Sequence, residues 1–326
     1  MPFFHPVRLQ TPEASTSCGE DIDRNTSERL VWRRELNCLR PSKPSLAVVW
    51  SQALFKLVKS LLQRLTREVK TPSRDSAADL ISAAGLRSIT DFDPKDVFVV
   101  GYPKSGNTWV QNLIAGAVYG VDLELTPDSL VQELIPDVHS KKVYKRYSSP
   151  VFFKSHAGPD PQYRRVIYLL RDGRDVMVSY YHYLRALKGD PIDLLELVQM
   201  RKGLFPCQWH EHVQRWLANP HQAEMLIVKY EDLKRNPMQE LLRICAFADF
   251  TRSASALEHA IRKASFAAMQ KREIALGWEN AHWPKDKLFV RRGEVGSYRD
   301  EMPPEVQKVF LREAKVVLQQ TGYMQG

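Results

Sequence analysis

A polar loop that follows an apolar run near residue 100 has side chains suited to binding an anion. The run at 96–100 is rich in Val and Phe, the loop over 102–108 reads Tyr-Pro-Lys-Ser-Gly-Asn-Thr, and a helical pattern follows it. A loop from a strand into a helix presents unpaired backbone N–H groups and the positive end of the helix dipole, which bind phosphate or sulfate. Gly106 permits close backbone approach, and Lys104 adds a positive charge. Further donors come from Ser105, Asn107 and Thr108.

The position of the lysine separates this loop from the common nucleoside-triphosphate loop. In the pattern G-x-x-x-x-G-K-[ST] the lysine follows the second glycine, whereas Lys104 precedes Gly106. This order argues against an ordinary ATPase or GTPase. Taken alone, such a turn is as often a plain connection, so its function depends on the blocks that accompany it.

Two further apolar runs are each followed by a residue that can do chemistry. His156 follows the run at 151–154, in the sequence Lys154-Ser155-His156. A histidine has an unperturbed pKa of about 6.5, so its neutral, proton-accepting form is abundant near neutral pH. Arg171 ends the run at 165–170, and Ser179 lies eight residues later. A strand end and a position two helical turns beyond it can face one pocket. A structural histidine and a surface ion pair of Arg171 are the alternatives.

Five blocks taken in this order resemble the soluble sulfotransferase family. They are 102–109 (Tyr-Pro-Lys-Ser-Gly-Asn-Thr-Trp), 154–156 (Lys-Ser-His), 171–181 (Arg-Asp-Gly-Arg-Asp through Ser-Tyr-Tyr), 230–233 (Tyr-Glu-Asp-Leu) and 291–293 (Arg-Arg-Gly). The resemblance covers roughly residues 95–323, about 70% of the chain. It implies an enzyme that transfers the sulfuryl group of 3′-phosphoadenylyl sulfate (PAPS) to a hydroxyl or amine of a small-molecule acceptor, without a metal.

The resemblance also implies a role for each matching residue. Lys104 neutralises the leaving phosphate oxygen, His156 is the general base, and Lys154 helps to hold the sulfuryl oxygens. The 5′-phosphosulfate is held by Ser105, Gly106, Asn107 and Thr108. The 3′-phosphate is held by Arg171, Ser179, Arg291, Arg292 and Gly293. The adenine contacts are Trp109, Tyr230 and Phe266, with Ser265 as a hydrogen-bonding neighbour.

The match departs from the family pattern in three places. Asn107 stands where many animal members have Thr, and its amide still supplies donors and an acceptor. The family commonly has a Gly-Asp-Trp element after its Arg-Lys-Gly block, and here Ser297 and Tyr298 replace the Asp and Trp. How this loop closes over the donor is therefore open. The C-terminal dimer motif of animal members is also missing, so the oligomeric state is open. His210 and His212 do not share a helix face, and we predict no metal there.

The elements that must position these residues form an α/β pattern. Strands are predicted at 96–100, 151–154, 165–170 and 225–230, with helical patterns between them. We expect a single P-loop-like domain with a central parallel sheet flanked by helices, over residues 95–326. The acceptor site is expected around 123–147 and 183–209.

The first 94 residues are expected to be an N-terminal extension. Residues 1–44 mix Pro, Ser, Thr and charges without periodicity, which predicts a flexible segment. Residues 45–94 are predicted to be an amphipathic helix and a linker. The helix, over 45–70, is basic; docking on protein is its ordinary role, and peripheral contact with an anionic membrane is the alternative.

Composition limits the class of protein. The 326 residues carry a net charge of +9, which favours an acidic ligand, and only four cysteines, too few for a disulfide framework. There is no apolar run long enough for a transmembrane span, and acids in the first 30 residues replace a signal core, so we expect a cytoplasmic protein. We expect no nucleic-acid partner. Two other functions stay open: a P-loop-type nucleotide phosphotransferase, and a non-catalytic nucleotide-binding or membrane-associated protein.

Overall fold

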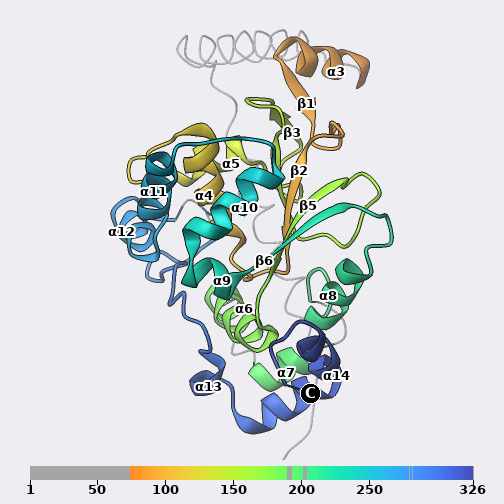
Figure 1. Ribbon diagram of the computed structural model, residues 1–326, viewed down its shortest axis with the longest axis vertical. Coiled ribbons are helices and arrows are strands. Elements are labelled where there is room, and N and C mark those ends of the chain that lie inside the picture. Colours follow the sequence, from red (N-terminus) through yellow and green to blue (C-terminus); the bar gives the residue numbers. More distant parts are fainter. Residues whose placement is uncertain (1–73, 189–192, 201–203, 279, 281, 326) are drawn as a thin grey trace, which may run out of the picture. The chain divides into compact units, whose positions relative to one another are not determined.

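The apolar runs form one parallel sheet. In the computed structural model, which describes residues 74–188, 193–200, 204–278, 280 and 282–325, the sheet has the strand order β4-β2-β5-β6 (Figure 1). Its strands are β2 (Val97–Gly101), β4 (Phe152–Ser155), β5 (Arg165–Leu170) and β6 (Glu224–Lys229). Val97 of β2 is opposite Phe152 on one side and Arg165 on the other. The four predicted strands are thus confirmed to within one residue at each end.

Side chains of each strand alternate between two hydrophobic cores. Val97 and Val99 of β2 point into one core, and Phe98 and Val100 point into the other. Helices cover both cores, as strands that are buried on both faces require. The first core is covered by α4 (Asn107–Tyr119), α5 (Asp128–Leu134), α10 (Pro237–Phe247) and α11 (Ala254–Lys263). The second is covered by α6 (Gly173–Lys188), α7 (Leu194–Gln199), α8 (Trp209–Ala218) and α14 (Pro304–Gln320).

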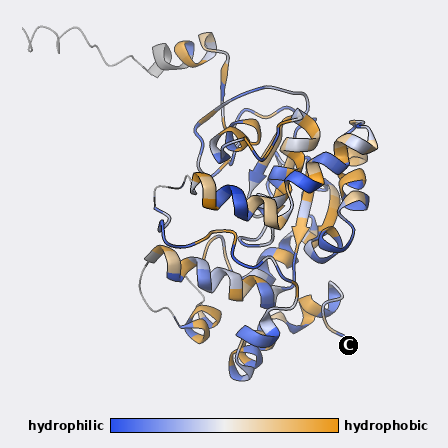
Figure 2. Cartoon of the chain, turned by 90° about the vertical axis from the view of Figure 1, so that its left-hand side faces the viewer, coloured by the Kyte–Doolittle hydropathy of each residue, from blue (hydrophilic) through white to orange (hydrophobic). Residues whose placement is uncertain are grey.

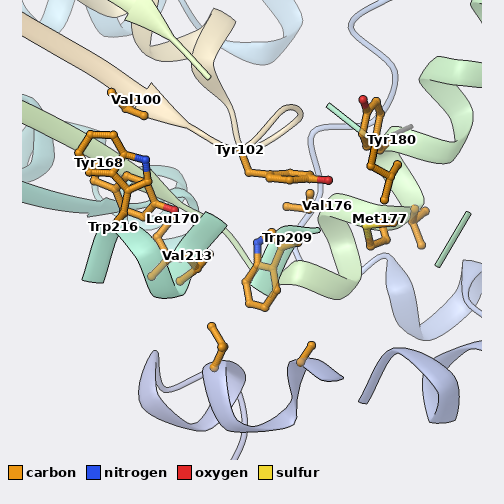
Figure 3. Close-up of a cluster of buried hydrophobic side chains, with 14 of the residues drawn as sticks. Val100, Tyr102, Tyr168, Leu170, Val176, Met177, Tyr180, Trp209, Val213 and Trp216 are labelled. Carbon is orange, nitrogen blue, oxygen red and sulfur yellow. The ribbon is translucent and has the colours of Figure 1, made fainter. Parts of the chain in front are cut away.

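Aromatic side chains fill much of the second core. Figure 3 shows Tyr102, from the loop after β2, among residues of α6 and α8, with Trp209 close below it. Tyr102 is 1% exposed, and its hydroxyl donates to the backbone oxygen of Cys207 at 2.8 Å. The start of the loop over 102–108 is therefore anchored in the core, which fixes the residues that follow it.

Shorter elements complete the chain. They are α3 (Arg74–Ala83), β1 (Leu86–Ser88), β3 (Val143–Lys145), α9 (Tyr230–Arg235), α12 (Phe266–Leu276) and α13 (Tyr298–Glu301). Antiparallel pairing of β1 with β3 joins residues before 95 to the main body. The predicted flexible segment 1–44 and the amphipathic helix 45–70 lie outside the described residues. Of the helices that are described, none combines the length and apolarity that crossing a bilayer requires.

The predicted α/β fold with a central parallel sheet is confirmed. The strands are mostly hydrophobic along their length, whereas the helices change between hydrophobic and hydrophilic residues from turn to turn (Figure 2). In such a fold ligands bind at the carboxyl edge of the sheet, because loops from several strands converge there.

Candidate functional site

A cavity of about 910 Å³ lies at the carboxyl edge of the sheet. The parallel strands β2, β4 and β5 end at Gly101, Ser155 and Leu170, and β6 ends at Lys229. The residues that follow each end line the cavity, because parallel strands bring their carboxyl ends together. Of the sixteen residues predicted for the site, all but Ser105 and Ser265 line it. Ser265 instead caps α12, its hydroxyl accepting the backbone N–H of Ala268 at 3.3 Å.

The loop after β2 has the conformation of an anion-binding turn. Lys104 and Gly106 have φ angles of 73° and 101°, and α4 begins directly after Gly106. Side-chain atoms of Ser105 (Oγ), Asn107 (Oδ1) and Trp109 (Nε1) are buried without a hydrogen-bond partner in the described structure. Buried polar atoms ordinarily have partners, so these fit a polar ligand that fills the turn.

The ammonium group of Lys104 lies in a strongly positive environment. Its Nζ lies 4.0 Å from the ring centroid of Phe289 and 4.7 Å from that of Tyr183, and no described carboxylate forms an ion pair with it. Burial, followed by the positive charges of Arg171 and Lys154, lowers the pKa of Lys104 to about 7. A bound anion would raise the pKa of Lys104 again, because it favours the charged form of the amine.

Binding of a phosphorylated ligand is therefore expected to take up a proton at pH 8. Lys104 is mostly neutral there in the free protein, whereas a ligand phosphate, with a second pKa of about 6, is already fully ionised. Calorimetric titration of adenosine 3′,5′-bisphosphate in buffers of different ionisation enthalpy should show uptake of about one proton. Lys104→Met should abolish the uptake, and an equal uptake by that variant would contradict the assignment.

His156 is held in the tautomer that a general base needs. Its Nδ1 lies 2.6 Å from the backbone oxygen of Gly101 and must donate to it, which leaves Nε2 as the proton acceptor. Burial, together with the ammonium group of Lys154, lowers the pKa of His156 to about 3. The imidazole is therefore neutral at physiological pH and ready to accept a proton.

A second histidine, His139, contacts His156, and no local sequence pattern indicated it. Nε2 of His139 accepts the backbone N–H of His156 at 2.9 Å, and the two rings stack with centroids 6.1 Å apart. The edge of Phe205 contacts both rings. His139 comes from the segment before β3, so only the folded chain brings it to His156.

Lys154 is ion-paired within the cavity. Its Nζ lies 2.9 Å from Oδ2 of Asp137, a carboxylate that also accepts the backbone N–H of His139 at 2.9 Å. Burial alone would raise the pKa of Asp137, but the Lys154 ammonium group outweighs burial and holds that pKa below its ordinary value. The pair fixes Lys154 at the cavity wall, two residues before the base.

Arg171 connects three walls of the site. Its guanidinium donates to the backbone oxygens of Lys104 at 3.1 Å and Glu294 at 2.8 Å, and it lies 4.2 Å from the ring centroid of Tyr230. Its Nε is buried without a partner in the described structure. The alternative of a simple ion pair fits poorly, because the nearest carboxylate, Asp175, is 3.9 Å away.

The second arginine block is held by a carboxylate that the sequence did not indicate. Glu301 of α13 accepts two hydrogen bonds from Arg291, at 2.7 and 2.9 Å, and one from Arg292 at 2.9 Å. Nε2 of His182 lies 2.7 Å from the same carboxylate. An end-on pair leaves Nε–H and the outer N–H groups of Arg291 available for a further anion.

The loop in which Ser297 and Tyr298 depart from the family pattern is fixed by one buried carboxylate. Asp175, which is fully buried, accepts the backbone N–H groups of Gly296 at 2.7 Å and Tyr298 at 2.9 Å, and the Ser297 hydroxyl at 3.3 Å. Tyr298 itself is buried in the second core. The substitutions thus keep a loop that is tied to the start of α6.

Three aromatic rings, those of Trp109, Tyr230 and Phe266, also line the cavity. Trp109 and Tyr230 meet edge to face with ring centroids 5.6 Å apart, and the Tyr230 hydroxyl donates to the backbone oxygen of Gly293 at 2.9 Å. Gly293 has a φ of 62°, and a Cβ added to it would lie 2.3 Å from Phe266. The glycine therefore lets the arginine block pack directly on the third ring.

Gly293→Ala is expected to weaken nucleotide binding by about tenfold or more, since the overlap forces Phe266 or the loop to move and one base–ring contact is worth about 1–3 kcal/mol. Titration calorimetry with adenosine 3′,5′-bisphosphate measures the change in affinity. Gly120→Ala is the matched control, because Gly120 has a φ of 66° with nothing within 4 Å of the added Cβ. Equal affinities of the two variants would show that the contact has no role in binding.

The segments expected to hold the acceptor contribute to the wall of the cavity. Asp128, Gln132 and Asp137 come from 123–147, and Tyr183 and Phe205 come from 183–209. The segment 278–290 also contributes, which the sequence did not indicate: Trp278 and Phe289 stack with centroids 4.2 Å apart. These segments contribute both aromatic and polar side chains to the cavity wall.

Comparison with known proteins identifies the family of the chain. The family model "Sulfotransferase domain" matches residues 94–322. Mouse sulfotransferase 1B1 is 26% identical over 234 residues, which cover 64% of this chain and 77% of the mouse protein. Flavonol 3-sulfotransferase of Flaveria bidentis is 28% identical over 252 residues, which cover 67% and 81%.

A solved structure of retinol dehydratase, in complex with retinol and PAP, has the same fold. It superposes with a TM-score of 0.55 at 20% identity, covering 70% of this chain and 82% of that protein. Because the family model spans more than two thirds of the sequence, and its range contains every residue placed in the site, the chain belongs to the sulfotransferase family.

Proposed function

We propose that this enzyme transfers the sulfuryl group of PAPS to a hydroxyl or amine of a small-molecule acceptor. One observation carries the proposal: His156, with its Nε2 available to accept a proton, and Lys104, without a carboxylate partner in the described structure, line the same cavity. Lys104 belongs to the turn after β2, where buried polar atoms have no partner in the described structure. These are the groups that an in-line displacement with charge on its leaving oxygen needs.

The residues present fit the donor. Its 3′-phosphate would lie among Arg171, Ser179 and the arginines of the second block, where guanidinium groups keep unused donors. Its adenine would lie between the rings of Trp109 and Phe266. When bound, PAPS supplies an activated sulfuryl group on a phosphate leaving group.

The side chains of this protein then carry the remaining steps. Nε2 of His156 takes the proton from the attacking acceptor group, and the hydrogen bond from Nδ1 to Gly101 keeps the ring oriented. Lys104 offers its positive charge to the leaving oxygen. The Lys154–Asp137 pair fixes an ammonium group beside the base.

Release of adenosine 3′,5′-bisphosphate from PAPS in the presence of phenols, alcohols and amines tests the proposal. We expect acceptor-dependent release that does not need magnesium. Turnover of ATP with magnesium, and none of PAPS, would instead support the nucleotide phosphotransferase. Binding of adenosine 3′,5′-bisphosphate without turnover of any acceptor would favour the non-catalytic alternative.

A further inference from the structure

A second cavity, of about 570 Å³, opens between α6 and the segment 283–291. It shares Lys104, Ser179, Tyr183, Phe289 and Arg291 with the donor cavity, so the two cavities adjoin. Its volume is within the range that small ligands occupy. The residues that line this second cavity and not the donor cavity are His182, Arg185, Ala186, Trp283, Lys287 and Leu288.

The charge of this second cavity has one sign. Lys104, Arg185, Lys287 and Arg291 line it, and no Asp or Glu is among the described residues that do. The nearby carboxylate of Glu301 is already shared by both arginines of the second block and by His182. A cleft lined by one sign of charge concentrates ligands of the opposite sign.

Besides Lys104, two of these cations have no acidic partner among the described residues. Arg185 donates to the Tyr181 hydroxyl at 3.0 Å, and in the part of the chain that the structure describes neither Arg185 nor Lys287 has an ion pair. Both are exposed, so they are within reach of a ligand. They differ from the proposed donor residues, because Arg185 and Lys287 line only the second cavity.

The wall of the second cavity is largely aromatic, and its rings are held by contacts with one another. Tyr183 and Trp283 stack with centroids 5.7 Å apart, and Phe289 meets both rings edge-on. Nε1 of Trp283 donates to the backbone oxygen of Lys287 at 2.7 Å, which ties the wall to one of the cations. Such a wall accommodates an apolar or flat ligand body beside a charged group.

We infer that the second cavity receives an acidic group of the acceptor, so that the preferred substrates are hydroxyl or amine compounds carrying a carboxylate or another anion. This inference rests on the proposed function, since it places the acceptor's reacting group at His156. The apolar body of the acceptor would lie along Tyr183 and Phe289, which line both cavities. Arg185 and Lys287 then determine specificity and take no part in the chemistry.

Acid and ester pairs test the inference without turnover. The probes are 4-hydroxyphenylacetate and 12-hydroxydodecanoate, each with its methyl ester, titrated by calorimetry into protein saturated with adenosine 3′,5′-bisphosphate. We expect each acid to bind about tenfold or more tightly than its ester, and added salt to reduce the difference. Arg185→Gln with Lys287→Gln should bring the ratio close to one while leaving the affinity for adenosine 3′,5′-bisphosphate unchanged.

Lys285→Gln with Arg312→Gln is the charge-matched control. Both residues are exposed and line neither cavity, so the preference for the acids should be retained. Acids that bind no better than their esters, or a preference that survives the first double variant, would overturn the inference. If adenosine 3′,5′-bisphosphate itself does not bind, the proposed function fails instead, and the acid and ester affinities are compared on the unliganded protein.

Discussion

Replacing His156 by Ala is expected to lower kcat on the order of 10²–10⁴-fold, because a positioned general base contributes about that much. Affinity for adenosine 3′,5′-bisphosphate should be nearly unchanged, since the imidazole is proposed to act on the acceptor and its Nδ1 is used by the backbone oxygen of Gly101. His156→Asn is the sharper variant, because its amide can still donate a hydrogen bond but cannot take the proton.

Steady-state kinetics with PAPS and any accepted substrate measure the loss, and His221→Ala is the control. His221 is exposed in a turn and lines neither cavity. The low pKa of His156 adds a pH signature: the acid limb of kcat/KM should lie well below pH 6.5, because the ring stays neutral until its folded pKa of about 3 is approached. A variant at position 156 that keeps most of its kcat would exclude this residue as the base.

Lys104→Met is expected to lower kcat on the order of 10²–10³-fold, the usual cost of removing one group that stabilises charge in the transition state. The same substitution should raise the free energy of unfolding at pH 7 and below. The folded pKa of Lys104 lies near 7, below its unfolded value, so between pH 7 and about 10 the unfolded chain binds more protons and wild-type stability rises with pH. At pH 7 and below, the buried amine costs stability that methionine does not.

Thermal unfolding at several pH values checks this second effect. The Lys104→Met variant should have the higher Tm at pH 6, and its Tm should rise less between pH 7 and 9 than that of the wild type. Lys285→Met, at an exposed position outside both cavities, should change neither quantity. A lower Tm of Lys104→Met at pH 6 would show that the ammonium group is stabilised by the fold.

Local sequence patterns predicted most of the sheet and the residues at its carboxyl edge. Apolar runs of four to six residues bounded by polar turns locate strands well. Lys104, His156 and Arg171 each lie within four residues of the end of a run, so they could be placed before any contact was known. Their convergence follows from parallel strands alone.

Residues that act across long separations in the chain could not be predicted in this way. Asp137 and His139 reach the base from a segment without a distinctive pattern, and Glu301 meets the arginine block only because α13 folds back on it. The hydroxyl of Ser265 was expected near the nucleotide, whereas the structure uses it to cap α12. A carboxylate partner depends on tertiary packing, which periodicity does not encode.

Comparison of adenosine 3′,5′-bisphosphate with adenosine 5′-monophosphate tests the central claim most directly, because the two ligands differ only in the 3′-phosphate that Arg171, Ser179 and the second arginine block are proposed to hold. Titration calorimetry at pH 7 should show the bisphosphate binding about a hundredfold more tightly, as expected when a doubly charged group meets several guanidinium donors. Equal affinities, or no binding of the bisphosphate, would contradict the assignment of this cavity as the site of a sulfuryl donor.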